Sequence, residues 1–221
     1  MLFRSGKMKR QIVLGIGLLA AFVIFTWSLT VIDVLPAGPD GSKVGYVQVN
    51  KWIHDQTGVS WTLYHFTDWA GAAVMLIPVF FAGMGMKQWI QRKSILKVDR
   101  DLLWLGAFYL AVVFTYIFFE NMVINRRPVV ISGVHEASYP SSTTVLSLCF
   151  MITAVRQAQM RIQKAWLRAG VCIFLSVFAA SLVIIRLMSG VHWFTDIAGG
   201  ILLSASLISL YFAGTEKMRG K

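Results

Sequence analysis

Six long apolar runs, separated by short polar clusters, dominate the pattern of residues along the chain. The runs cover approximately residues 12–35, 69–86, 102–124, 141–160, 169–188 and 193–214. A run of about 20 apolar residues is long enough to cross the hydrocarbon core of a bilayer as an α-helix. The pattern therefore predicts an all-α polytopic membrane protein, a bundle of six transmembrane helices that forms a single domain over residues 1–221. We expect Pro78 to kink the second helix.

The one substantial loop covers residues 36–67. It opens with turn-forming residues and then becomes rich in aromatic residues, among them Trp52, Trp61, Tyr64 and Phe66. Aromatic side chains gather at membrane–water interfaces, so the loop is expected to form one or two short amphipathic helices lying at the interface. His54 and His65 belong to the same loop, and no carboxylate or cysteine stands at metal-ligand spacing from them, which favours interfacial polar residues over a metal site.

Composition and charge agree with the membrane class. The chain is 57% hydrophobic and 14% charged, with a net charge of +11. The basic residues are concentrated in the N-terminal segment, in residues 87–100 and 156–168, and in a tail containing Lys217, Arg219 and Lys221. Basic loops face the cytoplasm, so both termini are predicted to be cytoplasmic. No nucleic-acid-binding module accompanies the charge. Cys149 and Cys172 lie within apolar runs and are expected to be packing residues rather than a disulfide.

Three arginines are predicted on the opposite, extracytoplasmic side, where membrane proteins normally have few basic residues. They are Arg126, Arg127 and Arg186. Binding an anion is a reason for them to be there. A snorkelling arginine followed by a turn is the alternative explanation for Arg127 and Pro128 taken alone.

Between the fifth and sixth runs, Arg186 is followed by His192 and Asp196. Ionisable groups near a membrane boundary mark a functional site by default. Residues four apart share one face of a helix, so Asp196 can orient the His192 imidazole. This layout suits a histidine nucleophile with a cationic clamp for phosphate.

A third segment is predicted on the same side of the membrane. Pro140 precedes Ser141, Ser142 and Thr143 at the start of the fourth run. The N-terminus of a helix offers free N–H groups to an anion, and the three hydroxyls add hydrogen-bond donors. An ordinary N-cap is the alternative for this segment taken alone. The order of the three segments on one side favours a phosphate site.

Together these segments resemble the type 2 phosphatidic acid phosphatase family of membrane lipid phosphate phosphatases. The family pattern has three motifs: Lys-x6-Arg-Pro, Pro-Ser-Gly-His and Ser-Arg-x5-His-x3-Asp. Here Arg127-Pro128 matches the end of the first, Pro140-Ser141 the start of the second, and Arg186-x5-His192-x3-Asp196 the core of the third.

The resemblance implies a metal-independent and cofactor-independent reaction. His192 would attack phosphorus to give a phosphohistidine, and Asp196 would orient its ring. The phosphoryl oxygens would be held by a set of phosphate-binding residues: Arg127, Arg186, Ser141, Ser142 and Thr143. The expected partners are the membrane and a phosphorylated lipid, and the expected location is a bacterial cytoplasmic membrane with the site on the extracytoplasmic side.

The sequence also departs from the family pattern. Glu120 replaces the lysine of the first motif, Ser142-Thr143 replaces Gly-His in the second, and Ile185 replaces the serine of the third. Glu120 is a candidate partner for an arginine. Without the second histidine no residue of that motif protonates the leaving group, a contribution typically worth about 10²–10⁴-fold. His135 or Glu136 is a candidate substitute acid.

Two functions follow from the departures. A diphosphate lipid of the polyprenyl type needs little protonation of its leaving group and is the favoured substrate over a phosphomonoester. The alternative is a catalytically impaired homologue that binds lipid phosphate head groups or partners envelope enzymes. A channel or transporter has little support, because the runs carry almost no ionisable residues away from their ends.

Overall fold

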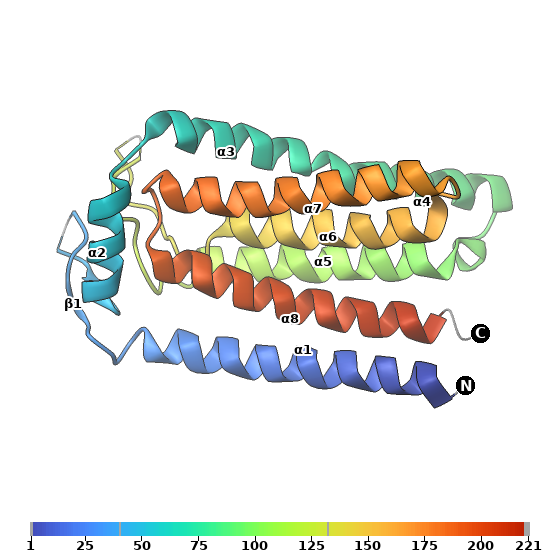
Figure 1. The fold of residues 1–221 in the computed structure, drawn as a ribbon, viewed down its shortest axis with the longest axis horizontal. Helices are drawn as coiled ribbons and strands as arrows, with labels where there is room; N and C mark the ends of the chain where they lie inside the picture. The colour runs from blue at the N-terminus through green and yellow to red at the C-terminus, as the bar shows by residue number, and fades with distance from the viewer. Residues whose placement is uncertain (1, 40, 132, 219–221) are drawn as a thin grey trace.

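The computed structural model describes residues 2–39, 41–131 and 133–218, and it confirms the all-α class (Figure 1). The elements, in chain order, are α1 (Leu2–Ser28), β1 (Leu35–Pro36), β2 (Lys43–Val44), α2 (Val47–Thr57), α3 (Trp61–Val74), α4 (Leu76–Arg92), the 3-10 helix η1 (Ile95–Lys97), α5 (Arg100–Asn121), α6 (Ser142–Arg161), α7 (Ala165–Met188) and α8 (Phe194–Met218). The two strands form a small antiparallel pair in the loop before α2.

Among the described residues, five helical segments are long and apolar enough to cross a membrane: Gly6–Ser28, Trp61–Arg92, Arg100–Asn121, Ala165–Met188 and Phe194–Met218. The chain is therefore an integral membrane protein. The fourth predicted run, residues 141–160, forms the helix α6, but this helix is not among the five. Its interior side chains explain this, because Thr153 and Gln157 are buried and hydrogen bond to Tyr109 and Tyr211 across the bundle.

The connections that carry most of the basic residues lie at one end of the bundle. Figure 1 shows the start of α1, the end of α8 and the α4–α5 and α6–α7 connections together, while α2 crosses the opposite end. This grouping agrees with the charge pattern, and the sidedness of the protein in the membrane stays a prediction. Arg219 and Lys221 of the predicted basic tail lie outside the described residues.

The first helix ends earlier than predicted, at Ser28 rather than near residue 35. The polar residue Asp33 interrupts the apolar run, with a left-handed backbone at φ 49°. Its carboxylate accepts a hydrogen bond from the backbone N–H of Gln48 at 2.8 Å, in the first turn of α2. Asp33 therefore caps the first turn of α2, and the chain turns away from the bundle before the apolar run ends.

The second transmembrane segment begins earlier than predicted and is broken. Ser60 caps the N-terminus of α3, where its side chain accepts from the Leu63 N–H, so residues 61–67 of the predicted loop are helical. The expected interfacial helix is α2. Met75 separates α3 from α4, and Pro78 follows three residues later. Proline has no N–H, so Pro78 cannot donate the helical hydrogen bond to the carbonyl of Val74. The break between α3 and α4 lies at this missing hydrogen bond.

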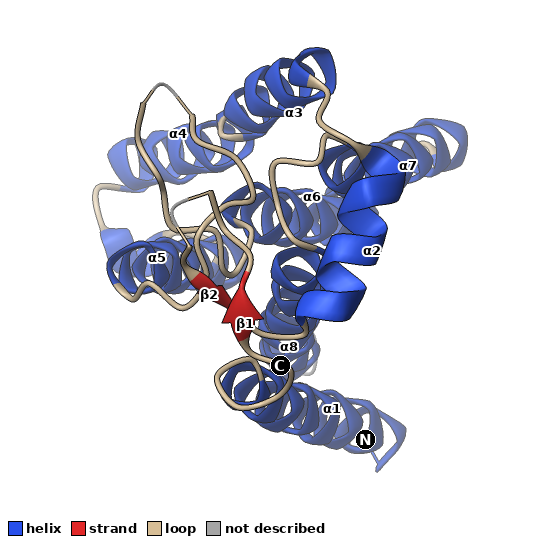
Figure 2. Cartoon of the chain, turned by 90° about the vertical axis from the view of Figure 1, so that its left-hand side faces the viewer, coloured by secondary structure: helices blue, strands red, loops and turns tan. Residues whose placement is uncertain are grey.

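Close helix packing holds α8 between α1 and the rest of the bundle (Figure 2). It is the most buried of the five segments and packs along α1 and against α5 and α6. Small residues allow this approach: the Ser206 hydroxyl donates to the Gly15 carbonyl at 2.8 Å, and Gly214 lies under the indole ring of Trp104. Trp104 in turn donates from Nε1 to the Tyr211 carbonyl at 3.0 Å.

The first prediction concerns this packing. A Cβ on Gly214 would overlap the Trp104 ring, so Gly214→Ala should destabilise the fold by about 1–3 kcal/mol, as overpacking typically does. The matched control is Gly170→Ala in α7, where a Cβ meets nothing within 4 Å. Thermal unfolding in detergent should show a lower Tm for Gly214→Ala and an unchanged or higher Tm for Gly170→Ala. Equal melting of both variants would contradict the α5–α8 contact.

Candidate active site

His192 lies in the short connection between α7 and α8, at the end of the bundle crossed by α2. Gly190 turns the chain with a left-handed φ of 67°, and a Cβ there would overlap the Gly58 carbonyl. Only glycine suits this turn, because L residues with side chains rarely adopt that backbone and the space is filled. Ser60 donates its N–H to the Ser189 carbonyl at 3.0 Å, so the α2–α3 connection packs over the turn. His192 is left 3% exposed.

The His192 imidazole is placed between a guanidinium and a carboxylate. Arg127 Nη1 lies 3.0 Å from Nε2, and Asp196 Oδ2 lies 3.5 Å from Nδ1. Arginine can only donate, so Nε2 accepts and carries the lone pair, and the ring proton is on Nδ1, on the side of Asp196. This tautomer exposes a nucleophilic nitrogen toward a cation, which is the arrangement needed to attack an anionic phosphorus centre.

Asp196 is held rigidly in the first turn of α8. Its Oδ2 accepts from the Trp193 N–H at 2.9 Å, and its Oδ1 accepts from Asn125 Nδ2 at 3.2 Å. The side chain is fully buried. A carboxylate near a helix N-terminus is stabilised by the free N–H groups and the helix dipole. The predicted pairing of Asp196 with His192 at positions i and i+4 is present in the structure.

The surroundings keep His192 uncharged. Burial lowers the pKa of the imidazole well below its usual value of 6.5, and the positive charges of Arg127 and Arg186 lower it further. An interaction with the backbone of Ser138 acts in the opposite direction. A neutral imidazole keeps its lone pair and can act as a nucleophile at neutral pH.

Arg127 lies where the sequence places a phosphate ligand, but its carboxylate partner differs from the prediction. Its Nε is 3.0 Å from Glu136 Oε2, so Glu136, and not the predicted Glu120, is the carboxylate paired with Arg127. His135, the other candidate acid, has Nε2 at 2.8 Å from the Arg127 carbonyl oxygen. Both candidate acids therefore support the position of Arg127.

Arg186 is buried but faces a different set of residues from Arg127. Its Nη1 donates to Thr67 Oγ1 at 3.0 Å, and its guanidinium carbon lies 5.1 Å from the centre of the Tyr64 ring. Both partners belong to α3. Arg186 was predicted to hold phosphate directly, but in the structure its side chain contacts α3. Its positive charge lowers the pKa of His192.

The three hydroxyl residues at the start of α6 separate in the structure. Ser141 is the N-cap and accepts from the Thr144 N–H, which is the ordinary N-cap arrangement considered for this segment. Ser142 lines a cavity beside His192. Thr143 points toward α3, since a Cβ on Gly71 would lie 3.4 Å from its methyl group. Thr143 is not a lining residue of that cavity.

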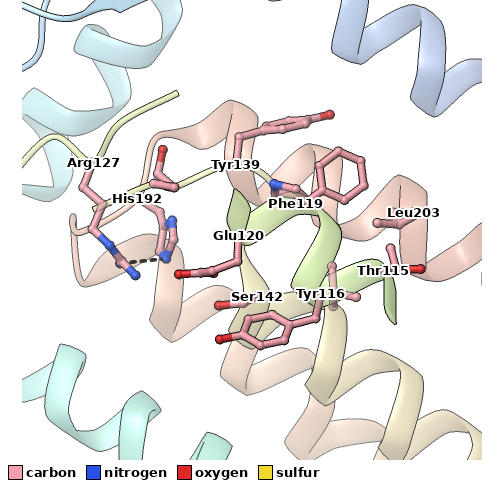
Figure 3. Close-up of a pocket in the computed structure, with 13 residues that line it drawn as sticks. Thr115, Tyr116, Phe119, Glu120, Arg127, Tyr139, Ser142, His192 and Leu203 are labelled. Atoms are coloured by element: carbon pink, nitrogen blue, oxygen red, sulfur yellow. Dashed lines mark hydrogen bonds between the residues drawn. The ribbon is translucent and has the colours of Figure 1, made fainter. Parts of the chain in front are cut away.

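The cavity beside His192 is narrow, about 20 Å³, and lies between α5, α6 and the α7–α8 connection. Its polar lining includes Glu120, Arg127, Ser142 and His192. Figure 3 shows the Glu120 carboxylate directed toward the Arg127–His192 pair, with Tyr116 one turn away on the same helix. The residue that replaces the lysine of the first motif therefore faces the site.

Three residues that support the site were not predicted: Asn50, Asn125 and Trp193. Asn50 Oδ1 accepts the Thr195 N–H at 3.1 Å, and its Nδ2 donates to Thr195 Oγ1 and to the Gly45 carbonyl. Asn50 thereby caps α8 from α2. Trp193 Nε1 donates to the Arg126 carbonyl at 2.8 Å. Asn125 stands directly before the two arginines in sequence, a local signal that could have drawn attention to it.

No group of three or more His, Cys, Asp and Glu side chains within residues 2–39, 41–131 and 133–218 is arranged to hold a metal ion. Of the residues that line the cavity, Arg127 and His192 contact each other at 3.0 Å, and Arg127 also pairs with Glu136.

Comparison with known proteins identifies the fold. The sequence matches no protein-family model and no curated protein. The structure is similar to the crystal structure of a transmembrane PAP2-type phosphatidylglycerolphosphate phosphatase from Bacillus subtilis, with a TM-score of 0.66 and 17% sequence identity. The match covers 94% of this chain and 98% of that chain. The chain therefore has a PAP2-type transmembrane fold, which confirms the resemblance at the level of the fold.

The second prediction tests the cap from α2. Asn50→Leu leaves the buried Thr195 N–H and hydroxyl without their partners, at a cost of about 1–3 kcal/mol for each unsatisfied group. A clearly lower Tm in detergent is expected. Lys51→Ala, at the adjacent exposed position, is the matched control and should melt like the unaltered protein. Should Asn50→Leu melt at the same temperature as the control, Asn50 would not be fixing the start of α8.

Proposed function

We propose that this protein is an integral membrane phosphatase that removes a phosphoryl group from a lipid through a phosphohistidine at His192. The observation that carries the proposal is the buried Arg127–His192–Asp196 arrangement, with an accepting Nε2 at 3.0 Å from a guanidinium nitrogen. The PAP2-type fold supports it, because the B. subtilis protein of that fold is a phosphatidylglycerolphosphate phosphatase.

The first chemical step forms one bond and breaks another. The Nε2 lone pair of His192 attacks phosphorus, and the bond from phosphorus to the leaving oxygen breaks, with the electron pair remaining on that oxygen. Asp196 stabilises the positive charge that develops on the ring, and Arg127 neutralises the phosphoryl oxygens. In the second step water attacks the phosphohistidine, inorganic phosphate leaves and the neutral imidazole is restored.

Binding a phosphoryl group requires Arg127 to exchange partners. Its Nη1 now donates to His192 Nε2. A phosphoryl group entering the narrow cavity would take over this donor, since a guanidinium binds phosphate oxygens more strongly than a neutral nitrogen. Arg127 then holds the oxygens and Nε2 is released for attack. Ser142 lines the same cavity and supplies a hydroxyl, and Arg186 adds positive potential from the direction of α3.

The leaving group favours a diphosphate lipid of the polyprenyl type. An alkoxide leaving group needs a proton, but Thr143 does not line the cavity, and His135 and Glu136 support Arg127. A phosphate leaving group is a far weaker base and departs without that help. Glu120 faces the cavity and can accept a proton from the attacking water in the second step. We propose that the site lies on the extracytoplasmic side of a bacterial cytoplasmic membrane, and the charge pattern supports this sidedness.

The third prediction tests the nucleophile. His192→Ala should abolish phosphate release and the acid-labile phosphoryl-enzyme, and Asp196→Asn should lower the rate by about 10³–10⁴-fold because the wrong tautomer is favoured. His65→Ala replaces an exposed histidine of α3 and serves as the control. Phosphate release from lipid and acid-quenched labelling are the measurements. Unchanged release by His192→Ala would rule out the mechanism. Lipid binding without release by the unaltered protein would favour the alternative lipid-phosphate-binding function.

The fourth prediction concerns the leaving group. Phosphate release from a polyprenyl diphosphate should exceed release from the corresponding monophosphate by about 10²-fold or more, the usual contribution of a general acid. The same polyprenyl chain in both substrates keeps binding of the tail equal. Faster release from the monophosphate would contradict the proposed substrate and would show that a proton donor reaches the leaving oxygen.

A further inference from the structure

A second and much larger cavity lies between α4 and α5. These two helices are neighbours at the left of the end-on view in Figure 2. Its volume is about 660 Å³. The lining is almost entirely apolar and includes Pro78, Gly85 and Trp89 of α4 and Leu102, Gly106 and Tyr109 of α5. An open apolar groove of this size inside a membrane suits a hydrocarbon chain.

Weak packing of α4 keeps this cavity open. No residue of α4 is fully buried, in contrast to α5 and α6. Two glycines remove side chains from the facing helices, because a Cβ on Gly85 or on Gly106 would meet nothing within 4 Å. We call this feature the α4–α5 groove. It is lined by the face of α4 that bears Pro78, Gly85 and Trp89, by the facing side of α5 from Leu102 to Val113, and by Met75, Ile95, Val98 and Phe150.

One face of α5 joins the α4–α5 groove to the cavity beside His192. Tyr109 and Val113 line the groove, and Tyr116 and Glu120 line the small cavity. Spacings of three and four residues place all four side chains on the same stripe of a helix. The stripe extends in the other direction through Gly106 to Leu102. A lipid with its phosphate beside His192 would therefore have its chain directed along α5 into the groove.

The length of this path exceeds one leaflet. From Glu120 to Leu102 the helix rises about 27 Å, at about 1.5 Å per residue. The hydrocarbon core of a bilayer is about 30 Å thick, so a chain that ends at the midplane follows only about half of that distance. Most of the groove lies beyond the reach of an acyl chain anchored at the level of Glu120.

We propose that the α4–α5 groove binds the single hydrocarbon chain of the lipid whose phosphate lies at His192, and that it selects polyprenyl chains long enough to cross the bilayer midplane. The proposal rests on the proposed phosphatase function and adds the tail that this site recognises. One groove leads from the site along α5, which fits a lipid with one long chain better than a lipid with two acyl chains.

Glycine substitutions test the groove without altering the residues around His192. Leucine at Gly85 or Gly106 would fill the groove without a backbone clash. Gly83→Leu is the matched control, since Gly83 also lies in α4, also has open space around a Cβ and does not line the groove. Thermal unfolding of the three variants in detergent checks that each is folded.

The kinetic measurement compares undecaprenyl diphosphate with the short-chain farnesyl diphosphate. The unaltered protein should have the lower KM for the long chain. Gly85→Leu and Gly106→Leu should raise that KM by about tenfold or more, since filling a hydrophobic site by a few methylene groups typically costs this much. Their kcat and their KM for farnesyl diphosphate should not change, and neither should any constant of Gly83→Leu. Equal losses for both chain lengths, or no loss in either groove variant, would overturn the proposal.

A binding measurement separates this proposal from the proposed function. Undecaprenol carries no phosphate, so its binding to the detergent-purified protein, followed by native mass spectrometry, reports the groove alone. Binding should be lost in Gly85→Leu and Gly106→Leu and kept in Gly83→Leu and His192→Ala. If no lipid phosphate is hydrolysed but this pattern holds, the phosphatase function fails and the groove stands. If hydrolysis occurs but undecaprenol binds the groove variants unchanged, the groove proposal fails and the function stands.

Discussion

Burial of one neutral histidine between an arginine and an aspartate is the constraint on which the site depends. Arg127 Nη1 lies 3.0 Å from Nε2 of His192, and the Asp196 carboxylate lies 3.5 Å from Nδ1, so the lone pair faces a cation and the ring proton faces an anion. Removing charged groups from water is costly unless they are paired and hydrogen bonded. The surrounding contacts meet this cost: Asn125 and the Trp193 N–H hold the carboxylate, and Glu136 pairs with the guanidinium.

The rest of the molecule keeps this arrangement rigid at one end of a helical bundle. The helix α8 begins at the site, and tight packing along α1 and under Trp104 fixes its direction. Asn50 caps its first turn from α2, and the turn at Gly190 packs against the α2–α3 connection. By contrast, α4 packs loosely beside α5 and leaves an apolar groove. Rigid and open regions thus match the two needs of the proposed lipid phosphatase, a fixed nucleophile and access for a hydrocarbon chain.

Much of the fold was predictable from sequence because apolar length alone specifies transmembrane helices. The predicted helix boundaries were wrong where a polar residue sets them. Asp33 interrupts the first apolar run because its carboxylate hydrogen bonds to the first turn of α2, and Ser60 caps the start of α3 inside the predicted loop. The His192–Asp196 pair was predictable because its four-residue spacing is local. The partners of Arg127 and Arg186, and the cap by Asn50, depend on contacts between distant segments, which one sequence does not reveal.

The protonation state of His192 is the measurement that tests the central claim most directly. Nitrogen-15 NMR of the labelled protein, with His192 assigned by comparison with His192→Ala, distinguishes the two neutral tautomers from the imidazolium. The account predicts a proton on Nδ1 and a free lone pair on Nε2 from about pH 6 to pH 8, since burial and two arginines lower the pKa below the ordinary value of about 6.5. A proton on Nε2, or titration near the ordinary value, would contradict it.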